Sequence, residues 1–372
     1  MVQIKSLRSP HVNAQVIQQQ SFARFSGLFA FLHRHHAALA DDICQAYLNT
    51  MRWYYLNQFS RYERALAKIR LHVLDRNDVI GHSDASRKTS VLTSAKSIGP
   101  HQDAFNIGRR GDALRTSNRV ALPSYLAEEE QGTHHAEMPF RNFNLALVEN
   151  AAAEYTFLAG FFAPPYPLST ISRHFGYIFD PTFSLGHDLT KTLTGNSFDG
   201  LGLLLCVRLT QQLAFELQRR KVPAMDGYIN ATSMLLWPRL QVIMDRQCES
   251  IRQWTESLPT SGGTKSEQSK HTIAPHVLTQ RFGQFLHGIL SLSAEAGDDE
   301  PIITSLHRLR SDVEQFLVRH SKAFGSDSRK ADRFLYNNYS LILTIISDMG
   351  GKLANEEREH FEKLRLQFQD GP

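Results

Sequence analysis

The sequence predicts an all-α protein. Apolar residues recur every three to four positions through most of the 372 residues, which is the spacing of one face of a helix. No stretch of alternating β-branched residues is long enough to form a sheet, and no fixed period of the kind found in helical repeat proteins runs along the chain. These three observations favour packed helices over a sheet-containing or solenoid fold.

The amino-acid composition excludes several classes of protein. Hydrophobic residues make up 42% of the chain and aromatic residues 10%, with a mean hydropathy of -0.32, which argues against a disordered tether and against a membrane-embedded protein. The net charge of +4 is far below that of a dedicated nucleic-acid-binding protein, so we expect no nucleic-acid partner. Three distant cysteines, Cys44, Cys206 and Cys248, argue against a disulfide framework and indicate a reducing compartment.

Residues 1–80 are predicted to form long amphipathic helices. The first helical segment, Asn13–His36, has one side rich in glutamine and one apolar side. The apolar side is predicted to consist of Val16, Phe22, Phe25, Phe29 and Leu32. The second segment carries an apolar stripe from Ile43 to Ile69 that includes Phe59, and we expect this helix to end near Asp75–Asp78.

Residues 81–104 are rich in serine and lack a sustained period, so they are predicted to be a flexible linker. Residues 105–257 are predicted to form a helical bundle. After an irregular stretch at Ala121–Met138, its helices are expected over Phe140–Phe162, Ser169–Ile178, Thr182–Leu193, Phe198–Arg220 and Asp226–Leu258. Pro181 is expected to separate two of these helices, and Pro238 to kink or divide the last one, because proline lacks the amide hydrogen of the helical ladder.

Residues 258–271 are predicted to be a second linker by composition, and residues 272–372 a C-terminal helical bundle. Its helices are expected over Pro275–Ala294, Pro301–His320, Arg329–Met349 and Leu353–Phe368. Pro301 follows three acidic residues, a combination typical of a helix start. Gly350 and Gly351 are expected to end the third of these helices.

Clustered histidines are the candidates for metal chemistry. His33, His35 and His36 lie just before Asp41 and Asp42, and a second cluster consists of His134 and His135. A metal site needs a third ligand and supporting hydrogen bonds, and the sequence offers neither at a recognisable spacing. We therefore predict that the chain is not an enzyme and has no catalytic residue, metal or cofactor. The alternative is an all-α metal-dependent enzyme that uses His33/His36 or His134/His135.

A local excess of positive charge lies at Arg109, Arg110, Arg115 and Arg119, with Asp112 as the only acidic residue among them. Such a cluster is a weak candidate for binding an acidic partner or a lipid headgroup. The interpretation that we favour is that these arginines are solvated or pair with Glu128–Glu130 farther along the chain.

Several collinear strings resemble one known family. They are DICQAYLNTMRWYYLNQFSRYERALAKIRLHVLDRNDVIG (Asp42–Gly81), PFRNFNLALVENAAAEYTF (Pro139–Phe157), DGLGLLLCVRL (Asp199–Leu209), RRKVPAMDGYINATSMLLWPRLQVIMDRQCESIR (Arg219–Arg252) and RFGQFLHGILSL (Arg281–Leu292). Together they resemble the middle and C-terminal region of the vacuolar protein sorting-associated protein 52 family. The strings VPAMDGY and LLWPR are the most specific. The family's long N-terminal coiled coil precedes the region that resembles this chain.

This resemblance implies a fold and a function. The fold is an elongated array of helical bundles of the type found in multisubunit tethering complexes. The function is that of a non-catalytic scaffold of the Golgi-associated retrograde protein (GARP) complex, which tethers endosome-derived vesicles at the trans-Golgi network. The implied partners are sister subunits, SNAREs and a Rab-type GTPase.

The implied location is the cytoplasm, peripheral on trans-Golgi network and endosome membranes. No apolar run approaches the roughly 20 residues of a membrane span, so we expect any membrane association to be peripheral. A further alternative is a general cytosolic helical adaptor unconnected with the Golgi.

Overall fold

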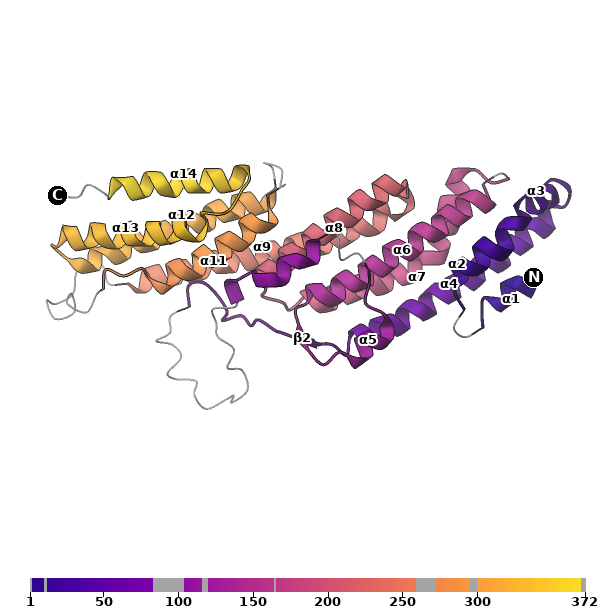
Figure 1. Cartoon of the computed structure of the whole chain (residues 1–372), viewed down its shortest axis with the longest axis horizontal. Helices are drawn as coiled ribbons and strands as arrows, with labels where there is room; N and C mark the ends of the chain where they lie inside the picture. The colour runs from indigo at the N-terminus through magenta and orange to yellow at the C-terminus, as the bar shows by residue number, and fades with distance from the viewer. Residues whose placement is uncertain are drawn as a thin grey trace. The chain divides into compact units, whose positions relative to one another are not determined.

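The computed structural model describes residues 2–9, 12–82, 104–115, 120–163, 165–258, 272–294 and 300–368. The predicted all-α fold is confirmed, because helices account for most of these residues (Figure 1). The strands within the described ranges are two residues each, β1 (Arg70–Leu71) and β2 (Thr133–His134). They pair in parallel, with Arg70 opposite Thr133. The predicted linkers 81–104 and 258–271 lie almost entirely outside the described residues.

The chain forms two compact units, and each is assembled from three separate segments. Unit 1 comprises Met1–His72, Arg115–Asn196 and Cys206–Leu236. Unit 2 comprises Val73–Leu114, Ser197–Leu205 and Trp237–Pro372. The two units therefore alternate along the sequence.

Unit 1 begins with a series of short helices of different types. They are α1 (Val2–Ser6), α2 (Ala14–Ile17), the π-helix η1 (Gln18–Phe22), the 3-10 helix η2 (Ala23–Phe25) and α3 (Ser26–His35). The Asn13 side chain caps α2 by accepting hydrogen bonds from the amides of Gln15 and Val16. The predicted helical segment Asn13–His36 is thus helical, but its changes of helix type alter which side chains face the core. Phe22 and Phe29 are buried as predicted, whereas Val16 and Phe25 are exposed.

The longest helix of the N-terminal region is α4 (Ala37–Leu66). Its predicted apolar stripe is confirmed, since Tyr55 and Phe59 are buried and Arg61 on the other side is exposed. The predicted end near Asp75–Asp78 is wrong, because the helix stops at Leu66 and the chain then enters β1. The parallel pairing with β2 takes up the backbone groups of Arg70 and Leu71 that would have continued the helix.

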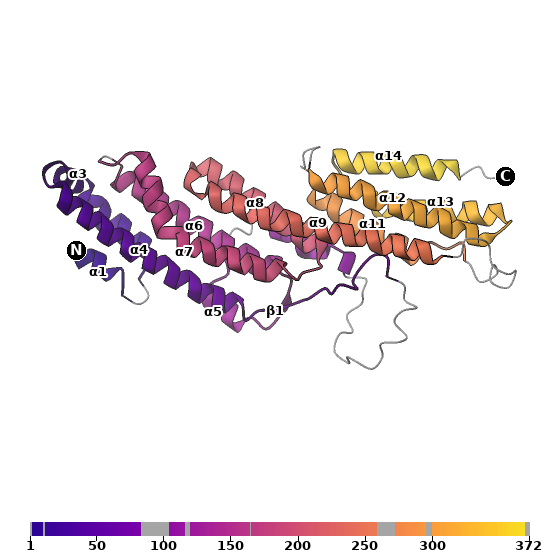
Figure 2. The ribbon, with the colours of Figure 1, turned by 180° about the vertical axis from the view of Figure 1, so that it is seen from behind.

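Three further helices pack with α4 or with one another in unit 1: α5 (Ser124–Glu129), α6 (Glu137–Phe161) and α7 (Leu168–Thr194). Figure 2, seen from behind, shows α4, α6 and α7 running side by side. Phe179 of α7 stacks on Tyr55 of α4 with ring centroids 4.5 Å apart. The stretch Ala121–Met138, predicted to be irregular, contains α5, β2 and the first two residues of α6.

The predicted break at Pro181 is wrong, because α7 continues through it. A proline at this position removes the amide that would bond to the carbonyl of Tyr177 four residues earlier. That carbonyl accepts a hydrogen bond from the Arg52 guanidinium of α4 instead. The same guanidinium lies 4.7 Å from the centre of the Tyr177 ring. Helix α7 therefore tolerates the proline because a neighbouring helix supplies the missing donor.

Helices α8 (Gly200–Arg220) and α9 (Asp226–Ser257) each contribute residues to both units, and the 3-10 helix η6 (Pro223–Met225) lies between them in the sequence. Helix α9 continues through Pro238, so this proline does not divide it. None of the helices in the described ranges is both long and apolar enough to cross a membrane.

The remaining helices of unit 2 are η5 (Gly108–Leu114), α11 (Val277–Leu292), α12 (Pro301–Ser321), η7 (Lys322–Phe324), α13 (Ser328–Ile345) and α14 (Lys352–Gln367). Pro301 occupies the first turn of α12, as predicted. Helix α13 ends at Ile345, four residues before the predicted end. Gly351, whose φ of 101° favours glycine, precedes α14.

Candidate functional site

The histidines at the end of α3 do not form a closed metal site. His33 is half-buried, with its ring 5.0 Å from that of Tyr166. His36 is exposed in the bend between α3 and α4. Within the described residues, no third histidine, cysteine or carboxylate comes within ligand distance of both His33 and His36.

The second pair of histidines lies at the short parallel sheet of unit 1. His134 belongs to β2, and its Nε2 lies 3.3 Å from Glu130 Oε1. The Glu130 carboxylate accepts a hydrogen bond from the Gly132 amide, which lowers its pKa, and the His134 contact lowers it further. The His135 ring packs beside His72, with centroids 5.1 Å apart. These contacts hold the turn before α6.

The arginines of the predicted basic cluster have different environments. Arg110 is largely buried in unit 2, where its Nη2 lies 2.5 Å from Asp199 Oδ2. Asp199 also accepts a hydrogen bond from the Gly202 amide in the first turn of α8. Arg109 is exposed beside Asp112, and Arg115 is exposed, whereas Arg119 lies outside the described residues. Arg110 thus has an internal partner other than Glu128–Glu130.

All three cysteines are free thiols in buried positions. Burial raises the pKa of Cys44 to about 12, and the nearby Asp41 carboxylate adds to this effect. Burial likewise raises the pKa of Cys248 to about 12. These two thiols are therefore protonated at neutral pH, which is the unreactive form.

A buried carboxylate, Glu154 of α6, lies at the centre of a hydrogen-bond network in unit 1. Its Oε1 accepts from the Tyr47 hydroxyl at 2.6 Å, and its Oε2 accepts from Gln18 Nε2 at 2.7 Å and from the Tyr55 hydroxyl at 2.9 Å. Burial raises the pKa of Glu154, while the three donors act in the opposite direction. The network joins η1, α4 and α6. Sequence patterns could not reveal it, because its members lie far apart in the chain.

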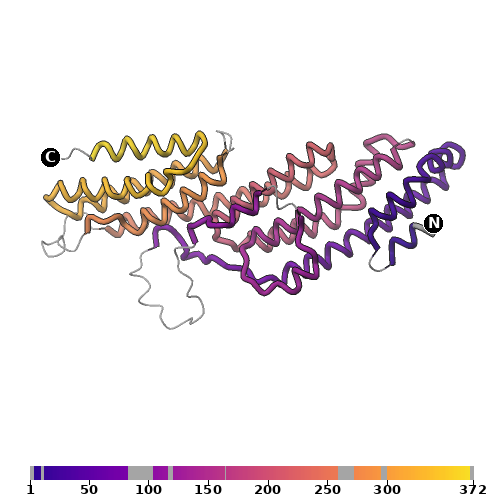
Figure 3. The backbone as a smooth tube through the Cα atoms, viewed as in Figure 1, coloured from indigo at the N-terminus to yellow at the C-terminus, as the bar shows by residue number. Residues whose placement is uncertain are grey.

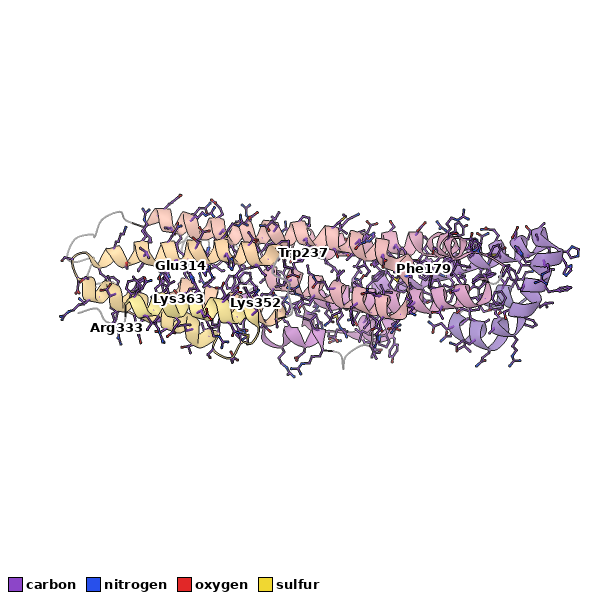
Figure 4. All side chains as sticks on the ribbon, turned by 90° about the horizontal axis from the view of Figure 1, so that it is seen from above. Phe179, Trp237, Glu314, Arg333, Lys352 and Lys363 are labelled. Carbon is purple, nitrogen blue, oxygen red and sulfur yellow. The ribbon has the colours of Figure 1, made fainter. Side chains whose placement is uncertain are left out.

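A second buried carboxylate, Glu357 of α14, has a different environment in unit 2. Its Oε1 accepts from Arg310 at 2.6 Å and lies 3.6 Å from His307 Nε2, whereas its buried Oε2 has no hydrogen-bond partner. Burial raises the pKa of Glu357 to about 7 despite the Arg310 charge, and Glu314 also raises it. Figure 4 labels Glu314 on α12, together with Lys352 and Lys363 on α14. Glu314 accepts a hydrogen bond from His360 of α14 at 2.6 Å.

Each unit has an open groove, within the described residues, that could bind a partner segment. In unit 2, the lining of a groove of about 530 Å³ includes the amide side chains of Asn106, Gln280 and Gln284 and the apolar side chains of Leu341 and Ile345. In unit 1, a groove of about 300 Å³ is formed by aromatic residues of α4 and by the segment before α5. The aromatic residues are Tyr54, Tyr55, Phe59 and Tyr62.

The chemistry of these grooves suits the binding of peptide segments. Amide side chains can exchange hydrogen bonds with an extended backbone, and aromatic rings offer apolar area at a low cost in conformational entropy. The Tyr62 hydroxyl already donates to the carbonyl of Leu122 at 2.6 Å. The Tyr54 and Tyr55 hydroxyls likewise donate within unit 1, to the carbonyl of Val12 and to Glu154, so all three tyrosine hydroxyls of this groove are already used as donors.

Comparison with known proteins matches nearly the whole chain to one family. The family model described as Vps52, C-terminal, matches residues 49–370. The chain is 31% identical to vacuolar protein sorting-associated protein 52 of Schizosaccharomyces pombe, over 98% of this chain and 69% of that protein. It is 31% identical to the Saccharomyces cerevisiae protein of the same name, over 90% of this chain and 57% of that protein. For the human homolog, the identity is 26%, over 97% of this chain and 48% of that protein. The chain thus spans about half to two-thirds of the length of these relatives.

Proposed function

This chain belongs to the Vps52 family, and from that premise we propose that it is a non-catalytic subunit of a vesicle-tethering complex. The observation that carries the proposal is the match over residues 49–370, which includes most of both units. The relatives are named for vacuolar protein sorting, a process of membrane traffic. The helical fold and the open grooves supply surfaces for partner helices and peptides.

The finer parts of the proposal concern the pathway and the partners. We propose that the complex is GARP, that it acts in retrograde transport from endosomes to the trans-Golgi network, and that the chain works from the cytoplasm as a peripheral membrane component. Its partners are then sister subunits, SNAREs and a Rab-type GTPase. The Cys44 and Cys248 thiols, held in the protonated and unreactive form, fit a non-catalytic role.

Two experiments test this function. Co-expression of the tagged chain with the sister subunits of its own organism should yield a complex that co-elutes in size-exclusion chromatography. A tagged copy expressed in cells should colocalise with a trans-Golgi marker. The chain eluting alone, together with a diffuse distribution in cells, would contradict the proposal.

A separate measurement addresses the enzymatic alternative. Metal analysis of the purified chain should find less than one zinc or iron per molecule. A stoichiometric metal that is lost in a His33→Ala/His36→Ala variant or a His134→Ala/His135→Ala variant would favour an enzyme instead.

A further inference from the structure

Helix α3 is apolar on two sides. On its inner side, Phe29 is buried against Phe161 and Phe162, with ring centroids 5.4 Å and 5.0 Å away. On its outer side, Leu28 and Phe31 lie three residues apart and share a face, and Phe25, the last residue of η2, precedes them. Phe25 is 43% exposed, Leu28 62% and Phe31 59%.

The exposed apolar surface continues into the first turn of α4. Leu39 is 52% exposed there, and all residues from Arg34 to Leu39 are exposed. Figure 3 follows this path through the bend between α3 and α4. Phe25, Leu28, Phe31 and Leu39 are called here the N-terminal apolar face. Scattered exposed apolar residues are normal on a protein surface, but four large ones within 15 residues are a local concentration.

The charge along residues 1–40 has one sign, whereas the exposed Asp41 and Asp42 border the α4 end of the N-terminal apolar face. Residues 1–40 contain no aspartate or glutamate, although about one residue in ten of the whole chain is acidic. Arg24 precedes α3 in η2 and Arg34 lies in the last turn of α3. Both are exposed, and within the described ranges neither guanidinium forms a hydrogen bond or an ion pair. The first acidic residues are Asp41 and Asp42, and Asp41 accepts a hydrogen bond from the Tyr166 hydroxyl.

We propose that the N-terminal apolar face contacts an anionic lipid bilayer. Phenylalanine and leucine side chains insert at the boundary between headgroups and acyl chains, and unpaired arginines beside them attract anionic headgroups. Aspartate or glutamate here would be repelled by such a surface, and residues 1–40 have none. The inference rests on the proposed function only in assigning the chain to membranes. Its test uses purified chain and lipids, so its outcome is independent of complex assembly.

Vesicle co-sedimentation tests the proposal. The full chain should bind vesicles of phosphatidylcholine mixed with phosphatidylserine, and should bind pure phosphatidylcholine more weakly. Replacing Arg24 and Arg34 by Gln should weaken binding to the mixed vesicles on the order of 30-fold, since each base near an anionic surface contributes about 1 kcal/mol. Replacing Arg61 and Arg64, which are exposed on α4, is the matched control and should have a much smaller effect.

The apolar part of the surface is tested by Leu28→Ser/Phe31→Ser. This variant should bind mixed vesicles at least tenfold more weakly while its thermal midpoint stays unchanged, because both side chains point away from the core. The matched control is Phe215→Ser, since Phe215 is 69% exposed on α8.

Fluorescence labelling reports membrane contact at one position, so it does not depend on comparing the binding of variants that have lost their fold. The three native cysteines are buried, so an environment-sensitive dye on a Leu28→Cys variant reports this position. Its emission should shift to the blue with mixed vesicles, and a dye on Phe215→Cys should not shift. Equal binding to both vesicle types, or no shift at position 28, overturns the proposal. So does a dimer that Leu28→Ser/Phe31→Ser converts to a monomer, because a second copy of the chain would then cover the face.

Discussion

At the residue scale, the two buried glutamates differ in the donors around them. Glu154 accepts three hydrogen bonds, from Tyr47, Gln18 and Tyr55, so that both of its oxygens are used. Glu357 is held through Oε1 alone. An ionised carboxylate is therefore well solvated by the protein at Glu154 and poorly solvated at Glu357. The same substitution, glutamate to glutamine, should therefore have different consequences at the two sites.

We predict that Glu154→Gln lowers the free energy of unfolding by about 1–3 kcal/mol, the cost of a buried donor left without an acceptor. The new amide nitrogen is itself a donor and would face the hydroxyl or amide donors that now bond to the carboxylate. Urea denaturation at neutral pH measures the loss. Glu129→Gln, at an exposed position of α5, is the control and should leave the midpoint unchanged.

For Glu357, we predict a stability that depends on pH. Its pKa is raised from 4.5 to about 7 in the folded protein, so the folded state binds this proton more tightly than the unfolded chain does. The stabilisation of the folded state by the proton on Glu357 is therefore fully present below pH 4.5 and is lost as the pH rises to about 7. The loss is on the order of 3 kcal/mol.

Glu357→Gln should remove this part of the pH dependence, because glutamine keeps an oxygen acceptor for Arg310 and does not ionise. Denaturation curves at several pH values between 4.5 and 8 would show it as a flatter profile than that of the wild-type chain. Glu359→Gln, at an exposed position two residues farther along α14, should keep the wild-type slope. An unchanged slope in Glu357→Gln would contradict the assignment.

At the element scale, α7 depends on a donor from α4. We predict that Arg52→Ala destabilises the chain by about 1 kcal/mol, because the Tyr177 carbonyl then has no partner in the protein. In a Pro181→Ala background, the helix regains its own amide donor, so Arg52→Ala should cost less there. A double-mutant cycle measured by thermal or urea unfolding gives this coupling energy. Additive effects of the two substitutions would mean that the contact does not compensate for the proline.

The same helix shows what sequence patterns can and cannot predict. Periodicity identified α4, α6, α8, α9 and the C-terminal helices, because each carries a long regular apolar stripe. Periodicity failed at Pro181, because a proline is a local signal for a helix break. The donor that compensates for it is the Arg52 guanidinium, which lies 125 residues before Tyr177 in the sequence. Periodicity also misassigned Phe25 to the buried side, since a π-helix and a 3-10 helix change the number of residues per turn before α3.

The candidate surfaces were predictable to a smaller degree. The basic residues and the phenylalanines near the N-terminus are visible in the sequence, but only the structure shows that Leu28 and Phe31 face outward. The Arg110–Asp199 ion pair and the Glu154 network join residues too distant in sequence for any spacing rule. The family resemblance, carried by strings such as VPAMDGY, was fully visible in the sequence, and the family match confirms it.

At the scale of the whole molecule, the alternation of segments makes a truncation informative. A chain that ends after Leu236 keeps all three segments of unit 1 and loses most of unit 2. We predict that it stays helical and unfolds cooperatively. Residues 73–82 should become sensitive to protease, because the Ile80 amide bonds to Gln247 and its neighbour His82 accepts from Arg281, and both partners are lost. Mass spectrometry of the first cleavage products, compared with the intact chain, locates the cuts. Protection of residues 73–82 in the shortened chain would contradict the assignment of these residues to unit 2.

The alternation also bears on how the protein is made by the ribosome. Residues 73–82 emerge early, yet the residues of unit 2 that bond to Ile80, Gly81 and His82 lie at Gln247, Ser250 and Arg281. Gly81 lies so close to the backbone of Ser250 that an added Cβ would be 2.3 Å from it, so this strip of chain fits only against a helix synthesised much later. During synthesis, the segments of unit 1 can fold while residues 73–82 still lack their packing partners. Those partners are made only in the second half of the chain. Such an interval exposes Val79 and Ile80 to non-native contacts, which makes this strip the place where a nascent chain most needs a chaperone.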